Sequence, residues 1–205
     1  MFKPGKHRFK PPLEILLGRG EAQGVKDIAT PHSVFVALGS NLGDSISVLV
    51  EAMERLEAFS AGPVRRSSFW GTSPVDCPPG SPPFVNAVVA LTPVAGETPE
   101  TLLGKLQALE REFGRGPKKV LNEPRPLDLD IIAWGNETRS TPALTLPHPR
   151  AAQRQFVLRP LAEIAPDLVL PGGVNSVAAL LAELRTDEVI RRLPGTGRPE
   201  FDSIQ

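Results

Sequence analysis

The segment that most constrains the fold is 124–132, because it reads as a strand with one apolar and one charged face. Successive side chains of a strand point to opposite faces. One face then carries three aliphatic side chains: Leu127, Leu129 and Ile131. The other face carries Asp128, Asp130 and Ile132. We expect the aliphatic face to pack on a core and the two carboxylates to stand about 7 Å apart on the opposite face.

Two like charges on a half-buried strand face repel each other and lose hydration. A hard divalent cation such as Mg²⁺ would compensate them, because it prefers carboxylate and phosphate oxygens. Alternatively, Asp128 and Asp130 lie on a solvated face or pair with nearby arginines. The strand alone leaves both interpretations open.

The bulk composition limits the partners more than the fold. The chain has 205 residues, which suits one domain, with 23 basic and 23 acidic residues. This charge balance gives no reason to expect nucleic acid or a membrane as partner. The single cysteine, Cys77, excludes an internal disulfide framework, and no apolar run approaches the roughly 18 residues of a membrane span. We therefore expect a cytoplasmic protein.

Periodicity and breaker residues predict mixed strands and helices. Besides the strand at 124–132, apolar runs predict strands at 34–38, 64–72 and 84–91. Asp44 is a candidate N-cap for a first helix, whose expected apolar stripe is Ile46, Leu49, Val50, Met53 and Leu56. Thr98 and Pro99 open a second helix that ends near Gly114. Further helices are expected at 156–164 and 177–184.

The order strand, helix, strand, strand, helix, strand predicts an α+β fold of the ferredoxin-like split β-α-β type. We expect an antiparallel sheet with its helices packed on one face. The opposite face is then either solvated or a site, and we assign Asp128 and Asp130 to it. Residues 1–31 are interpreted as an appended arm, 32–193 as the main domain and 194–205 as a C-terminal tail.

Cationic residues surround this strand in the sequence. Arg125, at the junction of loop and strand, is suited to bidentate contact with phosphoryl oxygens. Arg115 and Lys118 make the preceding loop basic, although a solvated loop would look the same. His148 is held between two prolines near Arg154, which is compatible with phosphate contact or with a structural role.

The pair Gln107 and Glu110 is spaced i, i+3, so both side chains share a face of the second helix. That face is either an ordinary helix surface or the border of a site.

Four segments, in order, resemble the signatures of 6-hydroxymethyl-7,8-dihydropterin pyrophosphokinases: 36–44, 84–87, 124–130 and 146–149. The correspondence runs from about residue 34 to 170, and its Arg-Pro-Leu-Asp-Leu-Asp segment is the most specific part. That family has a ferredoxin-like fold. It transfers the pyrophosphate of ATP to the pterin hydroxymethyl group and releases AMP, on the route to folate.

The resemblance implies roles for individual residues. For catalysis it implies Arg115, Arg125, Asp128 and Asp130. Two Mg²⁺ ions would be held by Asp128 and Asp130. The nucleotide would contact Gln107, Glu110, Arg115, Lys118, Arg125, Ile131, Thr145, His148 and Arg154. The pterin would contact Gly39, Thr72, Val75, Phe84, Asn86, Asp128 and Phe156. The expected partners are these small-molecule substrates, and the expected state is a monomer or weak homodimer.

The chain departs from the family pattern in its basic loop. Segment 121–125 reads Leu-Asn-Glu-Pro-Arg where a tryptophan and further arginines are common, and Pro117 replaces another arginine. Two rival functions stay open at this point: another magnesium-dependent transferase with an Asp-x-Asp motif, and a non-catalytic nucleotide-binding module. Some relatives are fused to neighbouring folate enzymes, but the short arm before residue 32 leads us to expect one activity.

Overall fold

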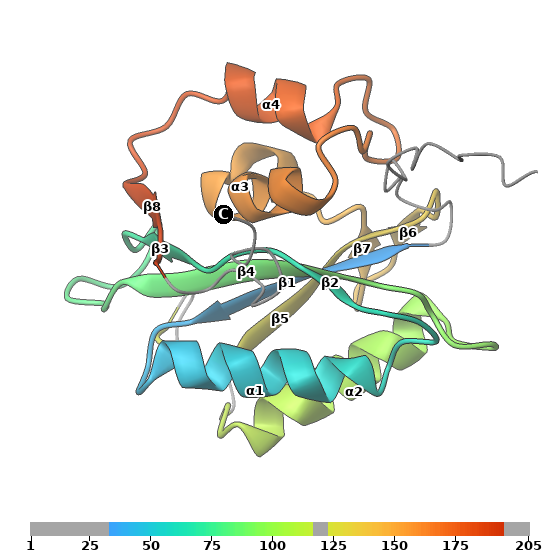
Figure 1. Cartoon of the computed structure of the whole chain (residues 1–205), viewed down its shortest axis with the longest axis horizontal. Helices are drawn as coiled ribbons and strands as arrows, with labels where there is room; N and C mark the ends of the chain where they lie inside the picture. The colour runs from blue at the N-terminus through green and yellow to red at the C-terminus, as the bar shows by residue number, and fades with distance from the viewer. Residues whose placement is uncertain (1–32, 117–122, 195–205) are drawn as a thin grey trace, which may run out of the picture.

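The computed structural model describes residues 33–116 and 123–194. The predicted arm 1–31, nearly all of the predicted tail 194–205, and Lys118 lie outside these residues. Figure 1 shows the elements, which follow the chain in this order: β1 Val34–Ser40, α1 Ser45–Glu57, β2 Arg65–Arg66, β3 Trp70–Thr72, β4 Phe84–Leu91, α2 Pro99–Glu112, β5 Asp128–Trp134, β6 Arg139–Ser140, β7 Thr145–Leu146, the 3-10 turn η1 Ala151–Gln153, α3 Gln155–Ile164, α4 Val177–Glu183 and β8 Ile190–Arg192.

The main sheet is antiparallel, with strand order β5-β1-β4-β3-β8 and with β2 also paired to β4. The register sets Gly39 of β1 opposite Asn86 of β4 on one side and opposite Asp128 of β5 on the other. Paired residues of antiparallel strands share a face. Three residues that are far apart in the sequence therefore stand side by side on one face of the sheet.

Helices cover both faces of this sheet, so the prediction that they pack on one face is wrong. In Figure 1, α1 and α2 lie below the sheet, whereas α3 and α4 lie above it. Strand residues that point to the upper face explain this second layer of helices, because Phe35, Val88 and Ile132 are apolar and pack against α3. Apolar runs without polar alternation, as in β4, are typical of strands buried on both faces. The polar site occupies one end of the upper face rather than the whole of it.

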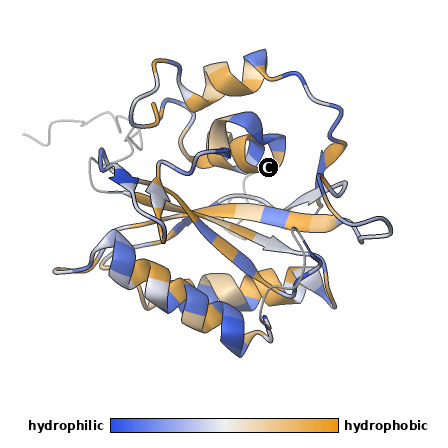
Figure 2. Ribbon diagram, turned by 180° about the vertical axis from the view of Figure 1, so that it is seen from behind, coloured by the Kyte–Doolittle hydropathy of each residue, from blue (hydrophilic) through white to orange (hydrophobic). Residues whose placement is uncertain are grey.

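The lower core confirms the alternation predicted for β5. Leu127, Leu129 and Ile131 are all buried there, against residues of α1 and α2. Figure 2 shows the hydrophobic faces of these helices turned towards the sheet. The stripe predicted for α1 is partly wrong, because Ile46 and Val50 are each 40% exposed. Leu49, Ala52, Met53 and Leu56 fill the buried face instead.

The single strand predicted at 64–72 is two short strands, β2 and β3. Ser67 lies in the interruption, where its hydroxyl oxygen accepts the Val88 N–H at 2.9 Å and its own N–H donates to the Val88 carbonyl at 2.9 Å. A side-chain oxygen thus takes the place of a backbone carbonyl in the ladder. Strand propensity could not reveal this substitution.

The predicted helix starts are confirmed. The Asp44 carboxylate accepts the Ser47 N–H, and Thr98 forms a capping box with Thr101 at the start of α2. The helices predicted at 156–164 and 177–184 are α3 and α4. The short strands β6, β7 and β8 were not predicted. Within the described residues, no helix combines the length and apolar character that a membrane span requires.

Candidate active site

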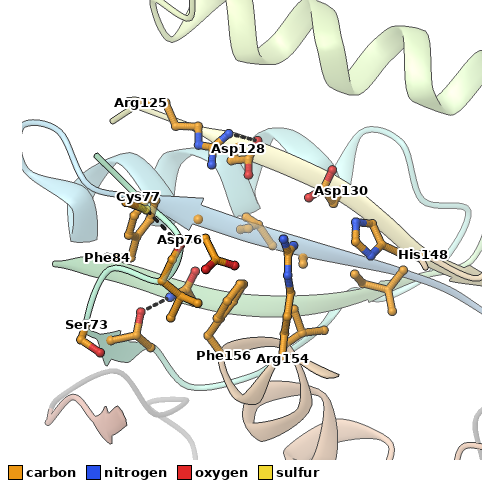
Figure 3. A pocket seen from close by; sticks show the side chains of 18 residues that line it. Ser73, Asp76, Cys77, Phe84, Arg125, Asp128, Asp130, His148, Arg154 and Phe156 are labelled. Carbon is orange, nitrogen blue, oxygen red and sulfur yellow. Dashed lines mark hydrogen bonds and ion pairs between the residues drawn. The ribbon is translucent and has the colours of Figure 1, made fainter. Parts of the chain in front are cut away.

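The two aspartates of β5 project to the same side and line one cavity at the polar end of the upper face (Figure 3). The prediction that they share a face is thus confirmed. Ala37 of β1 pairs with Asp130, and Gly39 pairs with Asp128, so small residues leave space beside each carboxylate. The strand delivers both acids to one opening because its side chains repeat every two residues.

Asp128 is also paired with two arginines, as the alternative interpretation of the strand expected. Its Oδ1 lies 2.8 Å from Nη1 of Arg115 and 3.4 Å from Nη1 of Arg125. Burial raises the pKa of Asp128, and the neighbouring charge of Asp130 raises it further, while the two arginines oppose the shift. Within the described residues, Asp130 has no such ion pair. The two acids therefore differ in how much positive charge already faces them.

Glu110 of α2 supports the ion pair between Arg115 and Asp128 from below the sheet. The side chain is 7% exposed, forms an ion pair with Arg115 and accepts the Leu129 N–H at 2.8 Å. Burial raises the pKa of Glu110 to about 7, although the Leu129 amide and Arg115 act in the opposite direction. Glu110 thus fixes both the backbone of β5 and an arginine that contacts Asp128.

Asn41, in the Gly-Ser-Asn loop after β1, holds two other loops in place. Its Oδ1 accepts the Arg125 N–H at 2.8 Å, its backbone N–H donates to the Arg125 carbonyl at 3.2 Å, and its Nδ2 donates to the Pro82 carbonyl at 3.2 Å. The side chain is 4% exposed. Asn41 therefore positions the backbone of Arg125 and, unlike Gly39 of the same loop, does not line the cavity.

An amide and aromatic side chains form the adjoining part of the cavity. Asn86 is 6% exposed and donates from Nδ2 to Oγ1 of Thr72 at 2.8 Å, which leaves its Oδ1 available on the cavity side. A Cβ on Gly39 would lie 3.1 Å from Oδ1 of Asn86 and 3.9 Å from Phe84. Glycine at 39 therefore keeps the space between Asn86, Phe84 and Asp128 open.

Arg154 closes the cavity on the side of α3, and His148 lines it beside Asp130 (Figure 3). Burial lowers the pKa of His148 to about 4, and the charges of Arg154 and Arg150 contribute. The Arg154 guanidinium lies 5.2 Å from the centroid of the Phe156 ring, in cation–π contact. A neutral imidazole and a fixed guanidinium suit an anionic ligand at this edge.

The cavity brings together most of the residues that the sequence singled out: Gly39, Thr72, Val75, Phe84, Asn86, Arg125, Asp128, Asp130, His148, Arg154 and Phe156. Others do not line it. Gln107 and Thr145 are exposed, and Ile131 packs in the lower core. Arg115 is paired with Asp128 but does not itself line the cavity, and Glu110 is buried behind it. Lys118 falls outside the described residues.

Several lining residues were missed: Ala37, Leu38, Ser73, Asp76, Cys77, Ile132 and Val157. The one local signal for Asp76 was its place in a proline-rich loop, where aspartate is a common turn residue; the structure gives it a positive φ of 51°. The others carried none, since their place depends on strand pairing and on the packing of α3.

The donor set of the cavity fits Mg²⁺ held partly by a ligand. In the described residues, no cluster of three or more acidic, histidine or cysteine side chains forms a complete metal cage. Magnesium in phosphate-handling sites is commonly bound by one or two carboxylates together with substrate phosphates. Asp128 and Asp130, on one face of one cavity, are such a pair.

An α+β fold with an antiparallel sheet, and with acidic, cationic and aromatic side chains in one cavity, indicates an enzyme of the phosphate-transferring class. Comparison with known families identifies it further. The chain belongs to the family described as 7,8-dihydro-6-hydroxymethylpterin-pyrophosphokinase (HPPK), whose sequence model matches residues 35–166.

Relatives with the name 2-amino-4-hydroxy-6-hydroxymethyldihydropteridine pyrophosphokinase support this assignment. The Pseudomonas aeruginosa protein is 42% identical over 165 residues, which is 79% of this chain and 97% of that protein. The Haemophilus influenzae protein is 36% identical over 163 residues, 79% of this chain and 99% of that protein.

Longer proteins match as well. The chain spans 22% of the Pneumocystis carinii folic acid synthesis protein fol1, at 34% identity over 164 residues. Among solved structures, wild-type Plasmodium falciparum HPPK-DHPS with pteroate superposes with a TM-score of 0.58 and 11% identity, over 74% of this chain and 44% of that one. At this identity the likeness supports the fold alone.

Proposed function

We propose that this protein transfers pyrophosphate from ATP to the hydroxymethyl group of 6-hydroxymethyl-7,8-dihydropterin and releases AMP, as a step of folate synthesis. The pterin hydroxyl oxygen forms a bond to the β-phosphorus, the bond from that phosphorus to the α–β bridging oxygen breaks, and the hydroxyl proton is lost. Family membership supports the reaction class. The roles proposed for particular residues rest on their positions in and around the cavity.

One observation carries this proposal: acidic, cationic and ring-binding side chains line a single cavity. Arg125 and Arg154 reach it from opposite sides, from the loop before β5 and from the start of α3 (Figure 3). Phosphate oxygens placed between two guanidiniums would be held by charge-assisted hydrogen bonds. Preorganised positive charge there would stabilise the charge that develops during transfer.

The pterin would occupy the slot beside Gly39. Oδ1 of Asn86 can accept a hydrogen bond from the pyrimidinone edge, and Nδ2 is oriented by Thr72. Phe84 and Phe156 would pack against the ring system. Because Asp128 lies next to Gly39 in the register, this arrangement would bring the hydroxymethyl group close to the carboxylates.

Asp128 and Asp130 would hold two Mg²⁺ ions that accompany ATP. When bound, the metal would neutralise phosphate charge and stabilise the attacking and leaving oxygens. Arg115 contacts Asp128 and is itself held by Glu110, so it would keep that carboxylate oriented. Arg125 would contact the transferred phosphates.

We also propose that the half of the domain from β1 to β5 is a ferredoxin-like split β-α-β unit. Its strand order, with β1 between β5 and β4 and with β2 and β3 beyond β4, supports this assignment. α1 and α2 then are the two helices of that unit, and α3, α4 and β8 are additions to it.

A coupled assay for AMP release from ATP and Mg²⁺ tests the function. We expect release only when hydroxymethyl-dihydropterin is present, with one pyrophosphorylated pterin formed per AMP. AMP release that does not depend on the pterin, or transfer to a sugar acceptor instead, would contradict the proposal. Binding of a non-hydrolysable ATP analogue without any AMP formation from ATP would favour a non-catalytic module.

A further inference from the structure

The segment 186–192 contacts both walls of the cavity without lining it. Its last three residues form β8, which pairs with β3 and sets Ile190 opposite Thr72. The two residues before β8 are Glu188, which is partly buried, and Val189, which is 70% exposed. Each of them makes a specific contact with a different wall.

Glu188 caps the helix of one wall. α3 begins at Gln155, and its own N-cap residue, Arg154, makes no side-chain capping hydrogen bond. Oε2 of Glu188 accepts the Phe156 N–H at 3.2 Å. A carboxylate at a helix N-terminus satisfies amides that lack an intrahelical partner and interacts favourably with the helix dipole. A residue from a distant part of the chain thus supplies the missing cap.

The capped turn carries two cavity residues. Arg154 and Phe156 both line the cavity, and the guanidinium of one stacks on the ring of the other. Their direction depends on the backbone of 154–156, because side chains in the first turn of a helix move with that turn. Figure 3 shows both pointing into the cavity from the α3 side. Loss of the cap would therefore loosen this wall.

Val189 holds the wall that is formed by the loop beginning at Ser73. The Ser73 N–H donates to the Val189 carbonyl at 3.0 Å, and the Val189 N–H donates to Oγ of Ser73 at 3.2 Å. Ser73 lines the cavity and opens the loop that carries Val75, Asp76 and Cys77 along it. Two successive residues of one segment therefore tie the start of α3 to the start of this loop.

We propose that Glu188 is a positioning residue, which holds the first turn of α3 at a fixed separation from the loop that begins at Ser73 and so sets the width of the pterin slot. The inference rests on the proposed function for the identity of the ligand. The hydrogen-bonded contacts of Glu188 and Val189 to two walls of the cavity carry it, and neither of these two residues lines the cavity itself.

Kinetics of three variants test this role. In Glu188→Ala we expect the KM for the pterin to rise about tenfold, because the turn that carries Phe156 and Arg154 loosens. The kcat at saturating pterin should stay within about threefold, because Arg125, Asp128 and Asp130 lie outside that turn. Glu188→Gln keeps an oxygen acceptor for the Phe156 N–H and should recover most of the loss. Asp187→Ala, at the exposed neighbouring position, is the matched control and should behave like wild type.

An unchanged pterin KM in Glu188→Ala, or an equal loss in Asp187→Ala, would overturn the inference. Failure of Glu188→Gln to recover the pterin KM would also overturn it, since the role is that of an acceptor. If the wild-type protein releases no AMP, the proposed function fails instead, and the positioning role is then decided by amide exchange.

Hydrogen exchange followed by mass spectrometry needs no turnover. In Glu188→Ala we expect faster exchange in segments 73–77 and 155–158 but unchanged exchange in β1 and β4, since those strands lie in the core. Unchanged exchange in both segments would contradict a brace between the walls. Uniformly faster exchange throughout the chain would show a general loss of stability and would equally contradict it.

Discussion

Replacement of Asn41 by alanine should uncouple the Gly-Ser-Asn loop from Arg125. The change removes the acceptor of the Arg125 N–H and the donor to the Pro82 carbonyl, at 2.8 and 3.2 Å. The Arg125 N–H lies in a partly buried loop, whereas Pro82 is exposed. Loss of the hydrogen bond to the Arg125 N–H therefore costs more free energy than loss of the one to the Pro82 carbonyl. With about 1 to 2 kcal/mol for the first and about 0.5 kcal/mol for the second, we expect Asn41→Ala to lose about 2 kcal/mol of unfolding free energy.

Urea unfolding followed by far-UV circular dichroism measures this loss, provided that the m-value is unchanged. Leu42→Ala, at the exposed neighbouring position, is the control and should stay within about 0.5 kcal/mol of wild type. We also expect kcat to fall about tenfold in Asn41→Ala, since a displaced guanidinium is poorly placed for transfer. An alanine variant within about 0.5 kcal/mol of wild type, with unchanged kcat, would refute the reasoning.

Three further predictions address the cavity. Asp130→Asn should nearly abolish AMP release with an unchanged circular dichroism spectrum, and near-wild-type turnover would contradict the role of the acid pair. Gly39→Ala should raise the pterin KM about tenfold, because its Cβ would approach Oδ1 of Asn86 to 3.1 Å; an unchanged KM would exclude that slot. His148 has a pKa lowered from 6.5 to about 4, so it is neutral in both folded and unfolded states above the higher value. As the pH falls between these values, the unfolded chain binds a proton that the folded chain excludes, so wild type should lose stability relative to His148→Gln by up to about 1 kcal/mol per pH unit. Thermal melts from about pH 7.5 to about pH 4.5 measure the difference, and parallel curves would contradict it.

Local sequence rules account for the parts of the fold that depend on neighbours along the chain. The alternation in β5 predicts that Asp128 and Asp130 share a face, since a strand has a period of two whatever it pairs with. Thr98 and Asp44 predict helix starts because a cap acts within three residues. The Gly-Ser-Asn loop was recognised as part of a family pattern, but its physical role became visible only in the contacts of Asn41.

The second helical layer could not be placed from periodicity alone. Apart from Asn86, β4 reads as apolar, and that pattern is compatible with burial on both faces, but it does not say which helix covers the upper one. A helix at 156–164 was predicted, whereas the position of α3 over Phe35, Val88 and Ile132 follows from the return of the chain across the sheet. The expectation of a one-sided sheet failed for that reason.

The sequence by itself determined the identity of the acids, their common face and the family to which the chain belongs. Tertiary structure alone decided that Gly39 stands between Asn86 and Asp128, and that Glu188 caps a helix that begins 33 positions earlier, at Gln155. The physical reason is range. Alternation and capping act over a few residues, whereas strand register and the docking of a distant segment depend on how the whole chain packs.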